Sequence, residues 1–154
     1  MTDSLRIESP IGPIWIEARG GALVSVTWSG RGDATSDTPV LTEAARQLQE
    51  YFAGTRTVFD LPLDPSGSDF QKQVYRAMSA IPFGNTRTYG DIAKELGVAA
   101  QPIGQACGSN PIPVIIPCHR VVASDGTLGG FSARGGVETK VALLKHEGAA
   151  SLLL

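Results

Sequence analysis

The sequence is poor in the residues that build metal sites and disulfide frameworks. Its 154 residues include two cysteines and two histidines, and none of these four lies before Cys107. Two cysteines in a reducing compartment favour free thiols over a bridge. The spacings of eleven, one and twenty-seven residues that separate Cys107, Cys118, His119 and His146 match no compact zinc motif. We therefore expect no metal and no other cofactor.

Long apolar runs and a strong net charge are also absent. No stretch of about eighteen apolar residues occurs, and the start MTDSLRIESP lacks the basic and apolar regions of a secretory signal. We expect a cytoplasmic, soluble protein with no membrane partner. The net charge is −2, so contact with a polyanion requires a local face. Residues 1–63 hold five basic and eight acidic residues, and residues 64–154 hold eight and seven, which favours the C-terminal part for such contact.

The N-terminal part has the pattern of a small β lobe. Residues 5–30 carry short apolar and β-branched runs that are interrupted by glycines and prolines, which predicts two or three antiparallel strands. Residues 40–54 then place apolar side chains at helical spacing and end at Gly54. We predict a first domain over residues 1–63, and a second over 64–154 that begins in the connector FDLPLDPSGS.

Three helices with clear end signals open the second domain. Ser68 is a candidate N-cap for an amphipathic helix that Pro82 stops. In TRTYGDIAKELG, Thr88 and Asp91 have capping-box spacing and Gly97 ends the helix. The segment QPIGQACGS follows as a third short helix, and the last two helices together predict a helix-turn-helix. Small residues on the last of these suit either entry into a nucleic-acid groove or tight packing on a neighbouring helix.

The segment VIIPCHRVVASDGTLGGF predicts a buried strand, a turn and a glycine-rich loop before a final helix in GGVETKVALLKHEG. Cys118 is a candidate nucleophile, and His119 is a candidate base for its proton. Neighbours on a strand point to opposite faces, so these two side chains need a bend or a relaying water. Glu147, or alternatively Glu138, is a candidate to orient the imidazole. A buried structural cysteine beside a hydrogen-bonded histidine is the alternative interpretation.

The stretch NPIPVIIPCHRVVASDGTLGGF resembles the active-site signature of the O6-alkylguanine-DNA alkyltransferases, also called methylated-DNA–protein-cysteine methyltransferases. The resemblance runs from about Asp69 to Gly148 and includes TYGDIA, IGQACGSNP and LLKHEG, while the N-terminal lobe agrees only in general pattern. It implies an α+β protein with a small antiparallel β lobe that is ribonuclease H-like and carries a helix. A mostly α-helical domain with a winged helix-turn-helix follows.

The resemblance also implies a reaction. Cys118 accepts an alkyl group irreversibly from O6-alkylguanine in double-stranded DNA, with O4-alkylthymine as a further candidate substrate. His119 acts as base through a water, Glu147 orients it, Asn110 braces the active-site turn, and Tyr89 helps to rotate the nucleotide and protonates the departing guanine. The thioether product has no carbonyl for water to attack, so each molecule acts once. We expect a monomer that is associated with the nucleoid when it acts.

The resemblance assigns two further groups of residues. Those expected to contact DNA are Gln101, Pro102, Gly104, Gln105, Gly108, Ser109, Thr88, Arg120 and Arg134, and those expected to line the base pocket are Phe131, Ser132, Val121 and Pro113. Arg120 is also a candidate for a structural ion pair.

The chain departs from the family pattern at three places. Gln101 stands where the family has an arginine that fills the gap left by the flipped base, and Phe131 stands where it has a tyrosine. The loop around Phe131 is two residues longer, and Arg134 within it is a candidate to restore the missing positive charge. The zinc site that some relatives carry in the N-terminal lobe cannot form here, because no cysteine or histidine precedes Cys107.

Two other functions stay open at this point. A lesion-recognition protein would flip the alkylated base and recruit other repair factors without transfer, and Cys118 argues against it. A thiol hydrolase would use Cys118 and His119 but would have no use for a helix-turn-helix.

Overall fold

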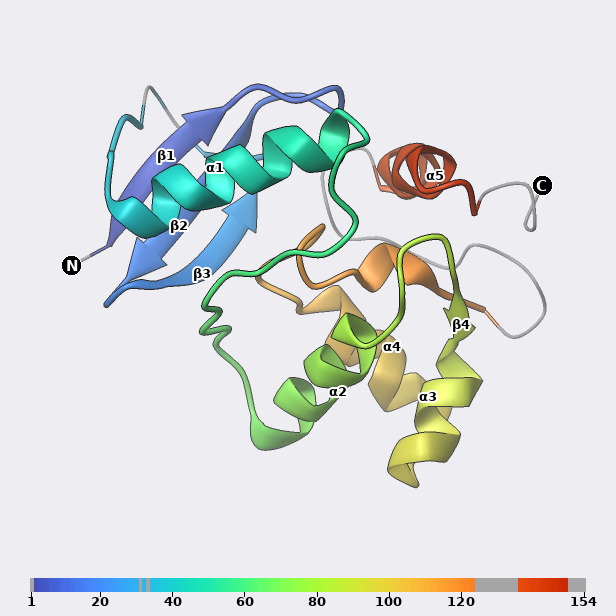
Figure 1. Cartoon of the computed structure of the whole chain (residues 1–154). Helices are drawn as coiled ribbons and strands as arrows, with labels where there is room; N and C mark the ends of the chain where they lie inside the picture. Colours follow the sequence, from blue (N-terminus) through green and yellow to red (C-terminus); the bar gives the residue numbers. More distant parts are fainter. Residues whose placement is uncertain (1, 31, 33, 124–135, 150–154) are drawn as a thin grey trace. The chain divides into compact units, whose positions relative to one another are not determined.

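The chain divides into two compact units, Met1–Ser66 and Gly67–Leu154. The computed structural model describes residues 2–30, 32, 34–123 and 136–149 (Figure 1). The sequence predicts the boundary after residue 63, within the same proline-rich connector.

The first unit contains an antiparallel sheet of three strands, where the sequence predicts two or three. Strands β1 (Asp3–Ile7), β2 (Ile14–Arg19) and β3 (Ala22–Thr27) are ordered β1-β2-β3. The turn between β2 and β3 is Gly20-Gly21, and both glycines have positive φ, which costs a residue without Cβ little. Short bridges at Thr35 and Leu63 extend the sheet at its two edges.

Helix α1 (Pro39–Phe52) lies across one face of this sheet (Figure 1). Its buried side chains include Leu41, Ala44 and Leu48 at spacings of three and four, which is one face of a helix. The sheet presents alternate residues of β2, and these are the fully buried Ile14, Ile16 and Ala18. Packing of these two apolar faces forms the core of the unit.

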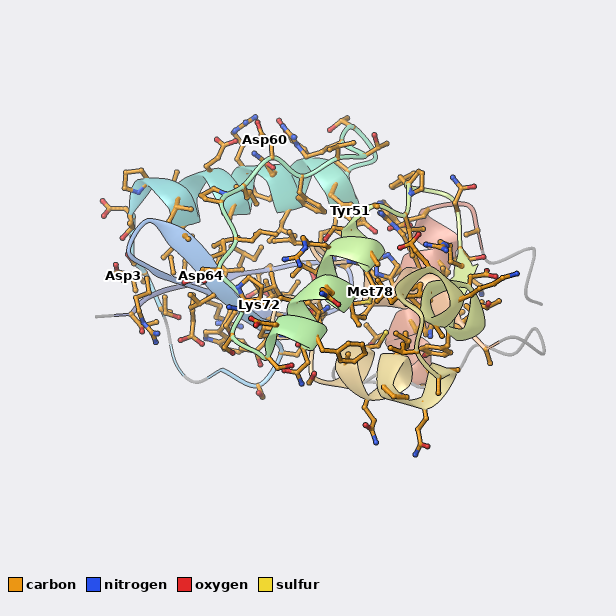
Figure 2. All side chains as sticks on the ribbon, turned by 90° about the horizontal axis from the view of Figure 1, so that it is seen from below. Asp3, Tyr51, Asp60, Asp64, Lys72 and Met78 are labelled. Carbon is orange, nitrogen blue, oxygen red and sulfur yellow. The ribbon has the colours of Figure 1, made fainter. Side chains whose placement is uncertain are left out.

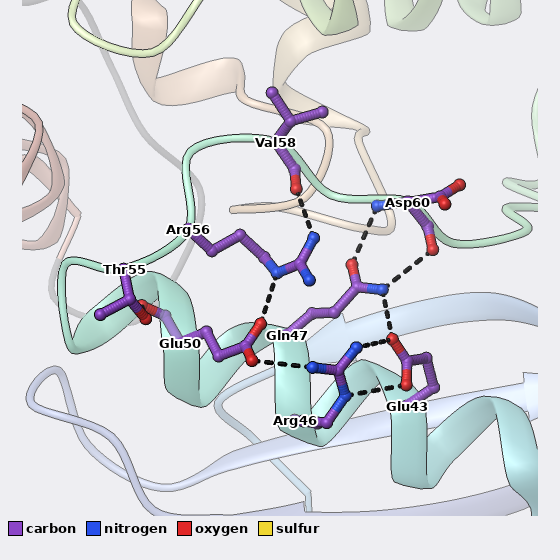
Figure 3. Close-up of polar contacts among 8 residues, drawn as sticks. All are labelled: Glu43, Arg46, Gln47, Glu50, Thr55, Arg56, Val58 and Asp60. Carbon is purple, nitrogen blue, oxygen red and sulfur yellow. Dashed lines mark hydrogen bonds and ion pairs between the residues drawn. The ribbon is translucent and has the colours of Figure 1, made fainter.

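Polar side chains along α1 attach the segment that follows the helix (Figure 3). The amide of Gln47 donates to the carbonyl oxygen of Asp60 at 3.0 Å and accepts from its backbone N–H at 2.9 Å. Arg56 donates to Glu50 at 2.8 Å and to the carbonyl oxygen of Val58 at 2.9 Å. These bonds hold residues 56–60 against α1.

The second unit begins with three helices, and the predicted caps of the first two are present. They are α2 (Asp69–Ser79), α3 (Tyr89–Leu96) and α4 (Ala100–Gly108). Ser68 with Gln71, and Thr88 with Asp91, form complete capping boxes, and Gly97 ends α3 at φ 70°. Helices α3 and α4 pack together across a turn of three residues, so the predicted helix-turn-helix is confirmed.

The core of this unit lies between its helices. Figure 2 labels Lys72 and Met78 on α2, and Met78 is fully buried. The last helix, α5 (Val137–His146), buries Leu143 and Leu144. None of the helices among the described residues has the length and apolar character needed to cross a membrane.

The predicted strand around Cys118 is wrong. Residues 111–117 form turns, Cys118–Arg120 form the 3-10 helix η1, and β5 is only Val121–Val122, which pairs in parallel with β4 (Arg87–Thr88). Pro113 and Pro117 lack the N–H that a ladder needs, and Val114 has φ 73°, a left-handed conformation that is incompatible with a strand. Apolar composition predicted burial correctly but not backbone geometry.

Candidate active site

Cys118 is the first residue of η1, and its thiol is buried. The residue is 4% exposed, and its backbone N–H donates to the carbonyl oxygen of Ile116 at 2.8 Å. Burial raises the pKa of the thiol to about 11, while the Asn110 side chain and the charge of Lys140 act in the opposite direction. The thiol is therefore protonated near pH 7, and it would need a base to act as a nucleophile.

Asn110 organises the turn that leads to this thiol. Its Nδ2 donates to the carbonyl oxygen of Ile116 at 2.9 Å, and its Oδ1 accepts from the N–H of Ile112 at 3.0 Å. Both bonds are buried and close the turn that contains the left-handed Val114. Left-handed backbone is unfavourable for a β-branched residue and persists only where neighbouring contacts enforce it. Asn110 thus determines where the chain enters η1.

His119, Arg120 and Glu147 form a buried polar cluster next to Cys118. His119 Nε2 lies 2.7 Å from Glu147 Oε2, and Arg120 reaches both carboxylate oxygens, with Nε 2.8 Å from Oε1 and Nη2 3.0 Å from Oε2. Arg120 Nη1 also donates to the carbonyl oxygen of Ile81 at 2.7 Å. Glu147 follows the last residue of α5 and is its C-cap, so the end of that helix brings the carboxylate to the cluster.

The hydrogen bond to Glu147 determines which ring nitrogen of His119 has a free lone pair. Burial lowers the pKa of the imidazole, so the ring is neutral near pH 7. With Nε2–H donating to Glu147, the lone pair is on Nδ1. Nδ1 is buried and has no hydrogen-bond partner among the residues that the structure describes. This nitrogen is therefore the one available to accept a proton.

Tyr89 and Lys140 provide a second pair of titratable groups. Tyr89 is the first residue of α3, and burial, followed by the neighbouring Cys107 and Cys118, raises its pKa to about 12. The phenol therefore keeps its proton near pH 7. Lys140 is fully buried on α5, its Nζ donates to the carbonyl oxygen of Val121 at 2.6 Å, and Nζ lies 5.8 Å from the centre of the Tyr89 ring.

Lys140 was missed by the sequence reasoning. Burial lowers its pKa to about 8, so the amine is still mostly protonated near pH 7 but loses its proton more easily than an exposed lysine does. The available signal was its place three and four residues before Leu143 and Leu144, on the apolar side of the last helix. A lysine at such a position needs a polar partner, and here that partner is the chain immediately after η1.

The exposed face of α4 borders an open hollow of about 480 Å³. The residues that line it are Tyr89, Ala100, Gln101, Gly104, Gln105 and Ala123. A Cβ added to Gly104 or Gly108 would meet no atom within 4 Å, so neither glycine is required by packing inside this unit. The face is smooth and uncharged, and its two long side chains are glutamines.

The other expected site residues lie at helix ends, in the buried interior or outside the described residues. Thr88 caps α3, Pro102 lies half-buried in the first turn of α4, and the Ser109 side chain accepts from Gln71 at 3.1 Å. Pro113 and Val121 are buried. Phe131, Ser132 and Arg134, with the longer loop that contains them, lie outside the described residues.

At two positions the geometry distinguishes between the alternatives that the sequence leaves open. Arg120 is 6% exposed and is occupied by Glu147 and Ile81, so the geometry supports the structural ion pair and not a DNA contact. Between the two candidate carboxylates, Glu147 rather than Glu138 binds the imidazole. No group of three or more potential metal ligands occurs among the described residues.

Fold and site together define a protein with a helix-turn-helix and a buried cysteine beside a His-Glu pair. The sequence matches two family models, the ribonuclease-like domain of 6-O-methylguanine DNA methyltransferase over residues 6–65 and its DNA binding domain over residues 69–149. The chain therefore belongs to the 6-O-methylguanine DNA methyltransferase family.

Individual relatives agree along nearly the whole chain. The methylated-DNA–protein-cysteine methyltransferase of Mycobacterium tuberculosis is 42% identical over 149 residues, which cover 92% of this chain and 89% of that protein. The crystal structure of the M. tuberculosis O6-methylguanine methyltransferase has a TM-score of 0.86 at 40% identity and covers 97% of this chain and 94% of its own. A structure of the M. tuberculosis protein in complex with DNA has a TM-score of 0.85 at 41% identity, covering 96% and 94%.

Proposed function

We propose that this protein repairs DNA by transferring an alkyl group from O6 of guanine to the sulfur of Cys118. The observation that carries the proposal is the buried thiol in a unit with a helix-turn-helix, next to a neutral imidazole whose Nε2 is held by Glu147. The M. tuberculosis relative is named for transfer of methyl groups from DNA to a protein cysteine, and a relative was crystallised with DNA.

The transfer follows from the protonation states of the site. His119 Nδ1 takes the thiol proton through a bridging water as the sulfur attacks the saturated carbon on O6. A carbon–sulfur bond forms and the carbon–O6 bond breaks, with its electron pair moving to the guanine. The phenol of Tyr89, whose pKa is raised to about 12, donates the proton that the guanine needs. The Glu147 carboxylate stabilises the imidazolium that forms.

The product makes the reaction stoichiometric. Its sulfur is a thioether, and a thioether has no carbonyl carbon for water to attack. No residue in the described cluster is placed to break the bond between the alkyl carbon and the sulfur of Cys118. Each protein molecule therefore repairs one lesion, and we expect it to do so as a monomer in the cytoplasm.

Helix α4 is the proposed DNA contact. A carbon on O6 lies inside the duplex, so the nucleotide must be rotated out, at a cost of a few kcal/mol of unstacking. The smooth face of Gly104 and Gly108 allows the helix backbone to approach the minor groove closely. Gln101 is exposed at the start of α4 beside the Tyr89 hollow and is proposed to occupy the vacated space.

A substitution at Gly104 tests this docking. Alanine meets no atom in the free protein and favours a helix by about 1 kcal/mol relative to glycine, so Gly104→Ala should raise thermal stability slightly. The added methyl group would stand between the helix and the groove, so duplex affinity should fall. Calorimetry and fluorescence anisotropy measure the two effects. Unchanged affinity would show that this face does not contact DNA.

Intact-mass spectrometry tests the transfer itself. The protein is mixed with a duplex that contains one O6-methylguanine, and we expect a stable gain of one methyl group at Cys118. Cys118→Ser should bind the duplex without gaining mass, and Cys107→Ala should be methylated normally. Tight binding of the unsubstituted protein with no mass change would instead support a lesion-recognition function. Repeated turnover of an acyl substrate would support a thiol hydrolase.

A further inference from the structure

We infer that Gln105 reads the base pair beside the lesion through the minor groove and makes transfer depend on the identity of that pair, with a preference for G·C. This inference rests on the proposed function, because it concerns the specificity of the same site. Gln105 thereby becomes a specificity-determining residue, distinct from the residues that carry the reaction.

The position of Gln105 is the first support. It lies four residues after Gln101, so the two amides project from the same face of α4. Both line the open hollow that Tyr89 also lines. Four residues of helix rise about 6 Å, which lies between one and two base-pair steps of about 3.4 Å each. A helix that places Gln101 at the vacated base therefore places Gln105 at a neighbouring pair.

The state of the amide is the second support. Gln47 is bonded to Asp60, and Gln71 completes the capping box with Ser68, so each of these amides maintains the fold. Gln105 is exposed, and its amide has no hydrogen-bond partner among the described residues. Gly104 and Gly108 flank it without side chains, so the amide is the group that extends farthest from this part of the face.

The chemistry of the groove determines the preference. In the minor groove an A·T pair presents only acceptors, whereas a G·C pair adds the N2 amino donor of guanine. A carboxamide has a donor and an acceptor in one plane, so it can donate to guanine N3 while it accepts from guanine N2. Against an A·T pair its oxygen finds no donor. The amide is uncharged, so this discrimination is independent of phosphate attraction.

Two sets of duplexes test the inference. Each duplex carries one O6-methylguanine at the same position, and the pairs on both sides are either G·C or A·T. The single-turnover rate of methyl transfer to Cys118 is measured on each duplex at limiting protein concentration. The rate on the G·C duplex divided by the rate on the A·T duplex is then compared between variants. Intrinsic differences in opening the two duplexes are common to all variants and cancel in this comparison.

Gln105→Leu keeps the size of the side chain and removes its hydrogen bonds. We expect the ratio to fall about tenfold, the value of one good bidentate base contact, with the slope of affinity against salt unchanged. Gln73→Leu is the matched control, because Gln73 is an exposed helical glutamine on α2, and its ratio should equal that of the unsubstituted protein.

The outcomes separate the two proposals. A ratio unchanged in Gln105→Leu overturns the inference while transfer to Cys118 stands. An equal fall in Gln73→Leu also overturns it, because the effect would then not be local to α4. Absence of methyl transfer from every duplex by the unsubstituted protein would refute the proposed function, and the inference with it.

Discussion

Two glutamates, one in each unit, bridge two basic side chains in different surroundings. On α1, Glu50 binds Arg46 at 2.7 Å and Arg56 at 2.8 Å, and its side chain is 34% exposed (Figure 3). After α5, Glu147 binds His119 at 2.7 Å and Arg120 at 2.8 Å, and its side chain is fully buried. The contact distances of the two glutamates are similar, but water reaches Glu50 and does not reach Glu147.

The difference lies in whether water can take the place of the side chains that each glutamate binds. Water can replace the partners of Glu50, so its bonds contribute little net stability. Nothing replaces those of Glu147, because each charge in that cluster has been removed from water and depends on the others. Among the described residues, the first unit buries one polar side chain, Gln47. The second buries Asn110, His119, Arg120, Thr139, Lys140 and Glu147.

The largest effect is expected for Glu147→Ala. The substitution leaves the Arg120 guanidinium buried without its carboxylate, which costs about 3–5 kcal/mol. Urea denaturation followed by circular dichroism measures the loss. Glu147→Gln keeps the shape and a hydrogen-bond acceptor, so it should fold better than the alanine variant but transfer alkyl groups slowly. A loss below about 1 kcal/mol in the alanine variant would contradict the comparison.

The pH dependence of stability should come from the same cluster. Burial lowers the pKa of His119 below its ordinary value of 6.5, so below that pH the unfolded chain binds a proton that the folded protein does not. The free energy of unfolding should therefore decrease as pH falls from 7.5 to 5. His119→Gln should show a smaller decrease over this range. Equal pH dependence in both proteins would show that His119 is not the titrating group.

Asn110 and Gln47 form a matched pair of buried amides, one in each unit. Each makes two hydrogen bonds to backbone groups, those of Ile116 and Ile112 for Asn110 and both of Asp60 for Gln47. Replacement of either by alanine should cost about 1–3 kcal/mol, because buried backbone groups lose their partners. Only Asn110→Ala should also slow alkyl transfer, measured as methylation per unit time. Slower transfer in Gln47→Ala would break the distinction between the units.

The smallest effect is expected for Glu50→Ala. Its two ion pairs are partly exposed, so the loss should be below about 1 kcal/mol and should shrink further at high salt. Denaturation curves at low and high salt measure both quantities, with Glu147→Ala as the comparison. A loss as large as that of Glu147→Ala would mean that burial is not the cause of the difference.

Signals between near neighbours were read correctly from the sequence. They are the N-cap at Ser68, the capping box of Thr88 with Asp91, and Gly97 at the end of α3, and each acts within about one helical turn. The partner of Ser68 in its own capping box, Gln71, was not predicted. The backbone of residues 111–117 was not predicted, because Val114 adopts a conformation that its own preference opposes. That conformation is held by Asn110, whose bonding partners cannot be deduced from composition or periodicity.

By itself the sequence determined the two-part organisation of strands followed by helices, the helix-turn-helix, and Cys118 with His119 as the residues of interest, because these follow from local pattern and from a motif. Tertiary structure decided between Glu147 and Glu138 as the partner of His119, and it decided how the site residues are bonded and protonated. His119 and Glu147 are 28 residues apart, Arg120 and Ile81 are 39 apart, and Lys140 reaches Val121 from another helix. Burial raises the pKa of the Cys118 thiol and lowers the pKa of the His119 imidazole. Burial is a property of the packed protein as a whole, so neither shift can be read from the sequence.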